Sequence, residues 1–233
     1  MNTSAEQRLR ANLAAAEDRI ANACARAGRT RSEVTLVAVT KTISVELAAL
    51  LPELGILDLG ENRPQEVWRK SEVLAKAIRW HLVGHLQRNK IDKTLPVVDM
   101  IHAVDSVRLL QALEQEAGRQ GRRIAVLLEV NASGEASKQG FDQTGIRALV
   151  PTLNDLKQVQ VRGLMTMATL QEPQACRPTF AALRQLRDQL GAQLAEAHSL
   201  AHLSMGMSND FEIAIEEGAT FIRLGTVLFE GLK

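Results

Sequence analysis

The chain has 233 residues, 45% of them hydrophobic, and carries a formal net charge of +1. This length is sufficient for one well-packed domain, and the near-neutral charge gives no electrostatic signature of nucleic-acid binding. No stretch approaches the roughly 18 consecutive apolar residues of a membrane span, and the charged N-terminal segment lacks the apolar core of a signal peptide.

The first predicted element is a helix over residues 5–27. Apolar side chains recur along it at spacings of four and three, at Leu9, Leu13, Ala16, Ile20, Ala23 and Ala27. They form one stripe on the helix, and Gly28 is a typical residue to end it. We therefore expect residues 1–28 to pack as a helix on the domain that follows.

After this helix, short β-rich runs alternate with helical segments to the end of the chain. The predicted strands are 34–40, 56–59, 80–83, 97–103, 123–130, 160–165, 201–205 and 220–224. The intervening helices include 106–118, which Asp105-Ser106 would cap, and an apolar face within 178–197.

Alternation of strands and helices favours a parallel sheet covered by helices. Eight strands favour a closed α/β barrel, the (β/α)8 or TIM barrel, over an open doubly wound sheet. We predict a single barrel domain over residues 1–233, with the N-terminal helix as an addition to the fold.

In such a barrel the functional face is the rim at the C-terminal ends of the strands. The first strand leads to Lys41, and the eighth contains Arg223. Strands one and eight are neighbours once the barrel closes, so these two side chains should face the same cavity. Lys41 is either a charge that reaches solvent or a group kept partly dry for chemistry.

Small-residue turns follow the last two strands, where barrels commonly hold a phosphate. They are Ser204-Met205-Gly206-Met207-Ser208 and Gly225-Thr226. A phosphate site beside a lysine and an arginine suits a phosphorylated aldehyde. A partly desolvated Lys41 near a cation would have a lowered pKa, and its amine could form a Schiff base with the aldehyde.

The motifs at these positions resemble those of the pyridoxal phosphate (PLP) homeostasis protein family, also called the PLP-binding protein family. They are Val39-Thr40-Lys41-Thr42, Gly60-Glu61-Asn62, Trp80-His81, Gly84-His85-Leu86-Gln87-Arg88-Asn89-Lys90, Ile101-His102-Ala103-Val104-Asp105-Ser106, Gly163-Leu164-Met165-Thr166-Met167, Leu203-Ser204-Met205-Gly206-Met207-Ser208 and Arg223-Leu224-Gly225-Thr226. The resemblance covers nearly the whole chain. It implies a TIM barrel similar to the N-terminal domain of bacterial alanine racemase.

The resemblance also implies a role for each matching residue. Lys41 would hold PLP as a Schiff base, and Arg223 would face its pyridine nitrogen. The remaining implied cofactor-binding residues are Asn62 along the cofactor, and Met207, Ser208, Gly225 and Thr226 at or near the phosphate. Lys138 matches a rim lysine of secondary importance.

Two positions depart from the family pattern. Thr40 replaces the more usual serine before the lysine, which is a mild change. Ile43 stands where some members carry a second lysine, so a transfer role assigned to that lysine is in doubt here.

Catalysis of the alanine racemase type is disfavoured. An arginine beside the ring nitrogen leaves the ring unprotonated and a poor electron sink. A two-base racemase also needs a tyrosine from a second domain, but the chain contains no tyrosine and no residues left for that domain. We therefore expect an intracellular PLP carrier or buffer with little or no catalysis.

Two other functions stay open. The chain could be a PLP enzyme acting on amino acids, with a cysteine or histidine as second base. It could instead be a barrel that binds another phosphorylated ligand, with Lys41 as a charge partner only.

Several further residues have both a functional and a structural interpretation. The His81/His85 and His198/His202 pairs lack a zinc-site pattern, so we expect no metal site. Glu61 and Glu66 are expected in capping or salt-bridge roles rather than as acid–base partners. The four methionines Met165, Met167, Met205 and Met207 could pack the barrel mouth, and only Met207 is expected at the cofactor.

The expected partners are PLP and PLP-dependent enzymes that lack their cofactor. We expect a monomer that contacts neither membranes nor nucleic acid. Two cysteines are too few for a disulfide framework, which favours a reducing, cytoplasmic setting.

Overall fold

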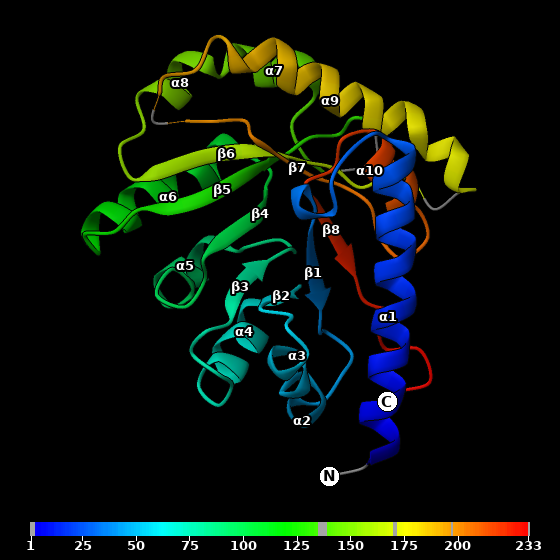
Figure 1. Cartoon of the computed structure of the whole chain (residues 1–233). Helices are drawn as coiled ribbons and strands as arrows, with labels where there is room; N and C mark the ends of the chain where they lie inside the picture. Colours follow the sequence, from blue (N-terminus) through cyan, green and yellow to red (C-terminus); the bar gives the residue numbers. More distant parts are fainter. Residues whose placement is uncertain (1–2, 135–138, 170–171, 197, 233) are drawn as a thin grey trace.

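The computed structural model describes residues 3–134, 139–169, 172–196 and 198–232. Eight parallel strands follow one another around a closed barrel, and the last strand pairs with the first (Figure 1). The strands are β1 (Thr35–Val39), β2 (Asp58–Glu61), β3 (Arg79–Leu82), β4 (Met100–Val104), β5 (Ile124–Glu129), β6 (Val159–Met165), β7 (His202–Ser204) and β8 (Phe221–Leu224). The predicted (β/α)8 barrel is confirmed.

Helices cover the outside of this barrel. They are α1 (Thr3–Arg26), α2 (Val45–Ala48), α3 (Leu50–Glu53), α4 (Pro64–Ser71), α5 (Ile91–Thr94), α6 (Val107–Arg119), α7 (Gln143–Ala148), α8 (Val150–Asn154), α9 (Arg177–Gly191) and α10 (Phe211–Glu216). Ser106 caps α6, as predicted, and its side chain accepts a hydrogen bond from the Leu109 N–H. The helix predicted within 178–197 ends earlier, at Gly191.

The long helix α1 lies along one side of the barrel (Figure 1). Leu9, Ala16 and Ile20 of its predicted apolar stripe are fully buried. In the N-terminal half of α1, the Asn12 side chain donates hydrogen bonds to the carbonyls of Leu228 and Glu230, both 3.0 Å away. These contacts join α1 to the segment that follows β8.

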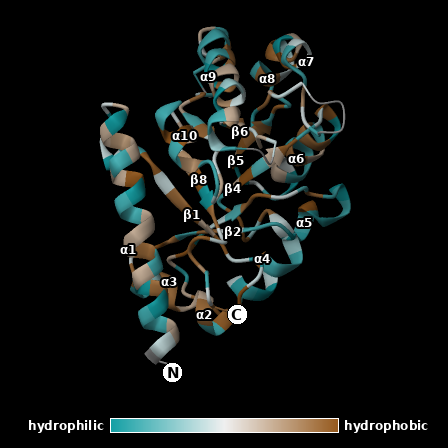
Figure 2. Ribbon diagram, turned by 90° about the vertical axis from the view of Figure 1, so that its right-hand side faces the viewer, coloured by the Kyte–Doolittle hydropathy of each residue, from teal (hydrophilic) through white to brown (hydrophobic). Residues whose placement is uncertain are grey.

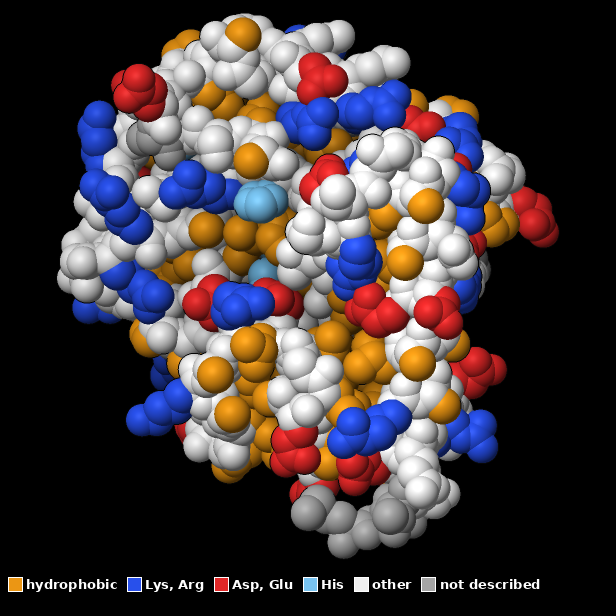
Figure 3. Space-filling view, viewed as in Figure 1, with side chains coloured by type: hydrophobic (Ala, Val, Ile, Leu, Met, Phe, Trp, Pro, Cys, Tyr) orange, Lys and Arg blue, Asp and Glu red, His pale blue; other side chains and the backbone are white. Residues whose placement is uncertain are grey.

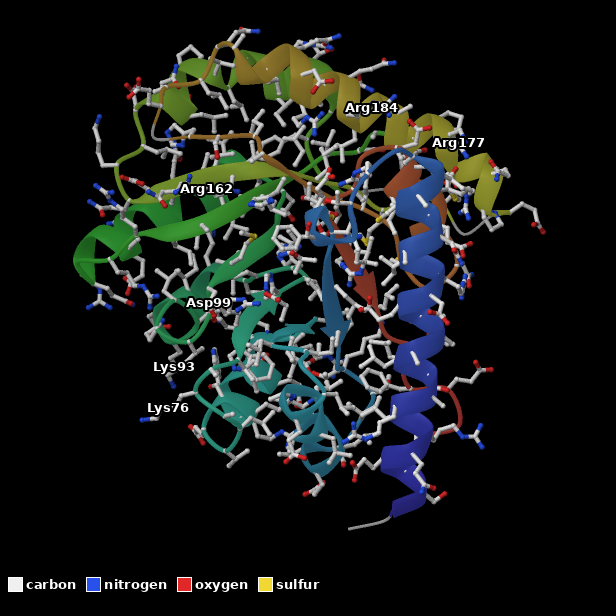
Figure 4. The ribbon with its side chains drawn as sticks, in the orientation of Figure 1. Lys76, Lys93, Asp99, Arg162, Arg177 and Arg184 are labelled. Atoms are coloured by element: carbon white, nitrogen blue, oxygen red, sulfur yellow. The ribbon has the colours of Figure 1, made fainter. Side chains whose placement is uncertain are left out.

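Ion pairs tie α10 to its neighbours. Arg177 and Arg184 of α9 (Figure 4) contact Glu217, which caps α10, at 2.8 Å each. Arg26 at the end of α1 contacts Glu216 at 2.7 Å. On the face of the molecule shown in Figure 3, acidic and basic side chains are interspersed, in keeping with the small net charge.

Strand residues alternate between two apolar cores, because successive side chains of a strand point to opposite faces. The larger core lies between strands and helices, where the ribbon of Figure 2 is mostly brown on the strands. The smaller core fills the barrel and contains Val37, Val39, Val83, Ala103, Leu127, Met165 and Phe221. Buried polar side chains share the barrel interior with this second cluster, which matters for the site below.

The predicted boundaries of β2 are wrong by two residues. The sequence predicts this strand at 56–59, whereas the structure has it at Asp58–Glu61. The Ile56 N–H instead bonds the Leu51 carbonyl, 2.9 Å away at the end of α3. The shift turns Glu61 from a turn residue into the last residue of a buried strand.

Asp58, at the start of β2, links folding stability to pH. Burial alone would raise its pKa, but hydrogen bonds from His81 and Arg79 outweigh burial and lower the pKa to about 2 from 3.8. Asp58 therefore contributes stability above about pH 4, and this contribution is lost as the pH falls towards 2. We expect Asp58→Asn to remove about 2 kcal/mol of pH-dependent stability between pH 5 and pH 2.

Urea unfolding at both pH values measures this effect. Asp18→Asn, at an exposed position of α1, is the matched control and should keep the wild-type pH dependence. An Asp58→Asn variant with the wild-type pH dependence would contradict the assignment.

Candidate functional site

A cavity of about 570 Å³ opens at the C-terminal ends of the strands. All seven residues predicted to bind the cofactor line it: Lys41, Asn62, Met207, Ser208, Arg223, Gly225 and Thr226. They come from β8 and from loops after β1, β2, β7 and β8, far apart in the sequence. Closure of the barrel brings them together at one rim, although their individual roles stay predictions.

Lys41 lies in a turn after β1, two residues beyond the end of the strand. The turn is closed by the Ile43 N–H, which donates to the Thr40 carbonyl at 3.2 Å. Lys41 is exposed, so of the two interpretations of this lysine the structure shows the side chain that reaches solvent. The physical reason is that β1 already ends at Val39, which leaves Lys41 on the open rim.

A fully buried polar cluster supports the backbone immediately before Lys41. The Lys70 Nζ of α4 donates to the Thr40 carbonyl at 2.7 Å and to Glu61 Oε1 at 2.6 Å. The Thr40 hydroxyl donates to the same Glu61 oxygen at 2.5 Å. Because the Thr40 carbonyl belongs to the peptide bond that joins Lys41, this cluster fixes where the Lys41 main chain begins.

The loops after β7 and β8 expose backbone donors to the cavity. Among the described residues, none accepts a hydrogen bond from the backbone N–H groups of Ser208, Asn209 and Thr226, which all line the cavity. The Ser208 Oγ accepts from the Val227 N–H at 3.3 Å, which holds the two loops together. Free N–H groups on adjoining loops are a typical cradle for a phosphate group.

Gly206 gives the first of these loops its shape. Its φ is +92°, and a Cβ there would lie 2.6 Å from the Ala214 Cβ and 2.9 Å from the Phe211 Cα. We expect Gly206→Ala to lower the free energy of unfolding by about 1–3 kcal/mol, because both the backbone conformation and the space oppose a side chain.

Denaturant unfolding checks this prediction. Gly118→Ala within α6 is the matched control, since the nearest atom to its added Cβ is the Gln158 side chain at 3.8 Å. That control should leave stability unchanged or raise it by up to about 1 kcal/mol. Equal behaviour of the two variants would show that the Gly206 loop can accept a side chain.

Arg223 reaches the cavity from inside the barrel. Its side chain is buried, and it donates from Nη1 to Ser204 Oγ at 2.6 Å and from Nη2 to the Thr166 carbonyl at 3.0 Å. Burial lowers the pKa of Arg223 to about 10, so the guanidinium stays charged at neutral pH. Two neutral oxygens therefore hold this cation at the cavity wall.

Several residues that line the cavity were not expected there from the sequence. Met167 lines it and is 42% exposed, whereas only Met207 was expected there. Asp210 also lines it and accepts from the Met207 N–H at 2.6 Å. Gly84 belongs to the wall because a Cβ there would lie 2.3 Å from the Asn62 carbonyl oxygen. The motifs that contain Gly84 and Met167 gave a signal in advance, whereas Asp210 stands in none of the motifs.

The remaining candidates take structural positions. Glu61 pairs with Lys70 and Glu66 with Arg69 at 2.7 Å, which confirms the salt-bridge interpretation of both carboxylates. His81 points into the barrel, while the His85 Nδ1 contacts Asp105 Oδ2 at the rim, 2.8 Å away. Met165 and Met205 are buried in the cores. Lys138 lies outside the described residues.

Comparison with known proteins bears on this site. Residues 11–232 match the model of the alanine racemase N-terminal domain family. The pyridoxal phosphate homeostasis protein of Aquifex aeolicus is 41% identical over 214 residues, which cover 91% of this chain and 93% of that protein. The human pyridoxal phosphate homeostasis protein is 33% identical over 97% of this chain and 87% of its own length. The chain belongs to the pyridoxal phosphate homeostasis protein family.

Solved structures agree with this family membership. PipY of Synechococcus elongatus, solved with PLP bound, is 37% identical and superposes with a TM-score of 0.79 over 90% of this chain and 99% of its own. The alanine racemase of Clostridium difficile superposes with a TM-score of 0.74 at 17% identity, over 96% of this chain and 56% of that enzyme. The second comparison establishes a shared barrel only.

One departure from the family pattern now has a structural position. Ile43, where some family members carry a lysine, is 6% exposed and packs in the core between strands and helices. An isoleucine side chain there supplies no second amine beside Lys41. A transfer route through a lysine at this position therefore does not apply to this chain.

Proposed function

We propose that this chain binds PLP as a Schiff base on Lys41 and acts as a carrier and buffer of the cofactor in intracellular PLP homeostasis. One observation carries the proposal: Lys41, Arg223 and the backbone donors of the two phosphate-type loops line the same cavity. The PLP-bound relative PipY and the relatives named for PLP homeostasis support it. Residues 1–233 would act as one cofactor-binding domain.

The residues present fit the chemical groups of PLP. The N–H groups of Ser208, Asn209 and Thr226 match a phosphate that accepts several hydrogen bonds. Gly225 lines the cavity without a side chain, and a Cβ there would lie 3.3 Å from the Val39 carbonyl oxygen. Arg223 would offer an N–H donor to the pyridine nitrogen, and Asn62 and Met207 would flank the cofactor.

Bound PLP supplies a reactive aldehyde, and this chain masks it. The amine of Lys41 would hold the cofactor covalently at this aldehyde carbon, with one water released. Because Lys41 lies on the open rim, water can re-enter and release the cofactor. Exposure of the lysine therefore suits a carrier better than an enzyme, which typically excludes water from its reaction.

Little or no catalysis is expected from this cavity. The Arg223 guanidinium cannot accept the ring proton, so the ring would stay unprotonated and withdraw electrons weakly. Among the described residues that line the cavity there is no histidine and no cysteine. Cys24 and Cys176, the second bases left open by the sequence, are buried in the outer core. A racemase-like side activity is the alternative.

Two measurements test the proposal. Purified protein mixed with PLP should show an absorbance band near the visible edge, and borohydride followed by peptide mapping should place the fixed group on Lys41. Loaded protein incubated with L-alanine in D2O should leave the Cα proton unexchanged by NMR. A protein that PLP cannot colour would overturn cofactor binding, whereas Cα exchange would favour the enzyme alternative.

The cellular setting follows from the same proposal. The chain would act in the cytoplasm as a monomer and donate PLP to enzymes that lack it, without membrane or nucleic-acid partners. No helix among the described residues is long and apolar enough to cross a membrane. Mixing loaded protein with a cofactor-free PLP enzyme and following recovery of that enzyme's activity measures the donation.

A further inference from the structure

A line of buried polar side chains crosses the inside of the barrel and ends at the cavity. His81 Nε2 contacts Asp58 Oδ1 at 3.0 Å, and His81 Nδ1 contacts His102 Nε2 at 2.9 Å. His102 Nδ1 then contacts Ser204 Oγ at 2.9 Å, and Ser204 Oγ accepts from Arg223 at 2.6 Å. We call Asp58, His81, His102 and Ser204 the interior chain.

The interior chain arises from strand alternation. Its members occupy inward-facing positions of β2, β3, β4 and β7, around the ring of Phe221 from β8. The His81 and His102 ring centroids lie 5.6 and 5.4 Å from that of Phe221. Aromatic packing therefore fixes both imidazole planes, and the half-buried ion pair of Arg79 with Asp58 closes the far end.

When both imidazoles are neutral, the donor and the acceptor of each hydrogen bond in the interior chain are determined. Burial first, then the nearby His81 and Arg223, lower the pKa of His102 well below its usual value. The ionised Asp58 can only accept, so His81 donates from Nε2 and accepts at Nδ1. His102 then donates from Nε2 and accepts the Ser204 proton at Nδ1. The Ser204 oxygen is thereby left to accept from Arg223.

Arg223 is held without a direct ion pair. Among the described residues, its hydrogen-bond partners are the Ser204 hydroxyl and the Thr166 carbonyl, and no carboxylate lies within salt-bridge distance. The hydrogen-bonded path from Arg223 to an anion runs through Ser204 and two imidazoles to Asp58. The carboxylates of Asp210 and Glu129 act on Arg223 through space. The positive charge and the remaining N–H groups of Arg223 are therefore available to the cavity that it lines.

We propose that Ser204 and His102 are positioning residues that orient Arg223 to donate to the pyridine nitrogen of PLP. This inference rests on the proposed function. Ser204 fixes one amino group of the guanidinium, and His102 fixes the direction in which the Ser204 hydroxyl points. Neither residue lines the cavity, so both act on the cofactor only through Arg223.

The test compares PLP with 1-deaza-PLP, which carries CH in place of the ring nitrogen and keeps the aldehyde and phosphate. The measured quantity is the ratio of the two dissociation constants. In the wild type, PLP should bind more tightly, because Arg223 has a ring nitrogen to donate to. In Ser204→Ala this preference should fall by about tenfold, the scale of one hydrogen bond to a charged group.

A second substitution in the interior chain makes the test independent of the Ser204→Ala variant. His102→Leu removes the acceptor of the Ser204 hydroxyl and should reduce the preference in the same way. His202→Leu is the matched control, because His202 packs against Phe221 at 4.7 Å between ring centroids but belongs to no link of the interior chain. That control should keep the wild-type ratio.

The outcomes separate this inference from the proposed function. Equal weakening of both ligands in Ser204→Ala and His102→Leu would leave the ratio unchanged, indicate a merely structural role, and overturn the inference. A wild-type protein that forms a borohydride-fixable adduct with neither ligand would instead overturn the proposed function. A selective loss of the PLP preference supports the positioning role.

Discussion

Lys41→Ala is expected to abolish the borohydride-fixed attachment of PLP and to weaken PLP binding by about 100-fold or more. Lys41 is the only lysine among the described residues that line the cavity, so no neighbouring amine can replace it. The backbone donors at Ser208, Asn209 and Thr226 would remain, so weak binding of the phosphate should persist. Absorbance titration and mass spectrometry after borohydride measure both effects.

The control for this variant is another exposed lysine. Lys76 lies between α4 and β3, away from the cavity lining, and is labelled in Figure 4. The control variant is Lys76→Ala. It should bind PLP as the wild type does and give the same fixed mass. If Lys41→Ala retained a fixed group at wild-type stoichiometry, another lysine would carry the cofactor and the assignment would be wrong.

Lys70→Met should lower the free energy of unfolding by about 3–5 kcal/mol. Lys70 and Glu61 have side chains 1% and 0% exposed, and their charged atoms lie 2.6 Å apart. Loss of the ammonium group would leave the Glu61 carboxylate buried, with the Thr40 hydroxyl as its remaining hydrogen-bond donor among the described residues. Urea unfolding measures the change, which is large beside a typical domain stability of about 5–15 kcal/mol.

A double variant separates the cost of the unpaired charge from the cost of lost packing. Lys70→Met with Glu61→Leu removes both charges and should recover most of the lost stability. The exposed pair of Arg69 and Glu66 on the same helix serves as control, and Arg69→Met should cost less than about 1 kcal/mol. A Lys70→Met protein as stable as the Arg69→Met protein would show that the buried pair is not a major support.

The same pair bears on the cofactor site. Lys70 bonds the carbonyl of Thr40, and the next residue is Lys41. The stability of the protein and the position of Lys41 thus depend on the same buried contact, between Lys70 of α4 and the residue that follows β1. This dependence explains why a charged residue of a short helix is fully buried.

The sequence by itself determined the number and order of the strands. Runs such as Thr35–Val39 and Ile124–Glu129 are apolar and β-rich, and a parallel strand buried on both faces needs that composition. Barrel topology then places the C-terminal ends of all strands at one rim. For this reason the seven cavity residues, from Lys41 to Thr226, could be predicted from strand ends and motifs alone.

Only the tertiary structure decided which side chains meet inside the barrel and which meet between the barrel and its helices. The period of two along a strand assigns faces only when the strand boundaries are known, and the shifted start of β2 changed the position of Glu61. The burial of Lys70, within the polar segment Pro64–Ser71, has no signal in local sequence. The contacts from Asp58 to Arg223 depend on the register of β2, β3, β4, β7 and β8 around the closed barrel, and no local pattern encodes that register.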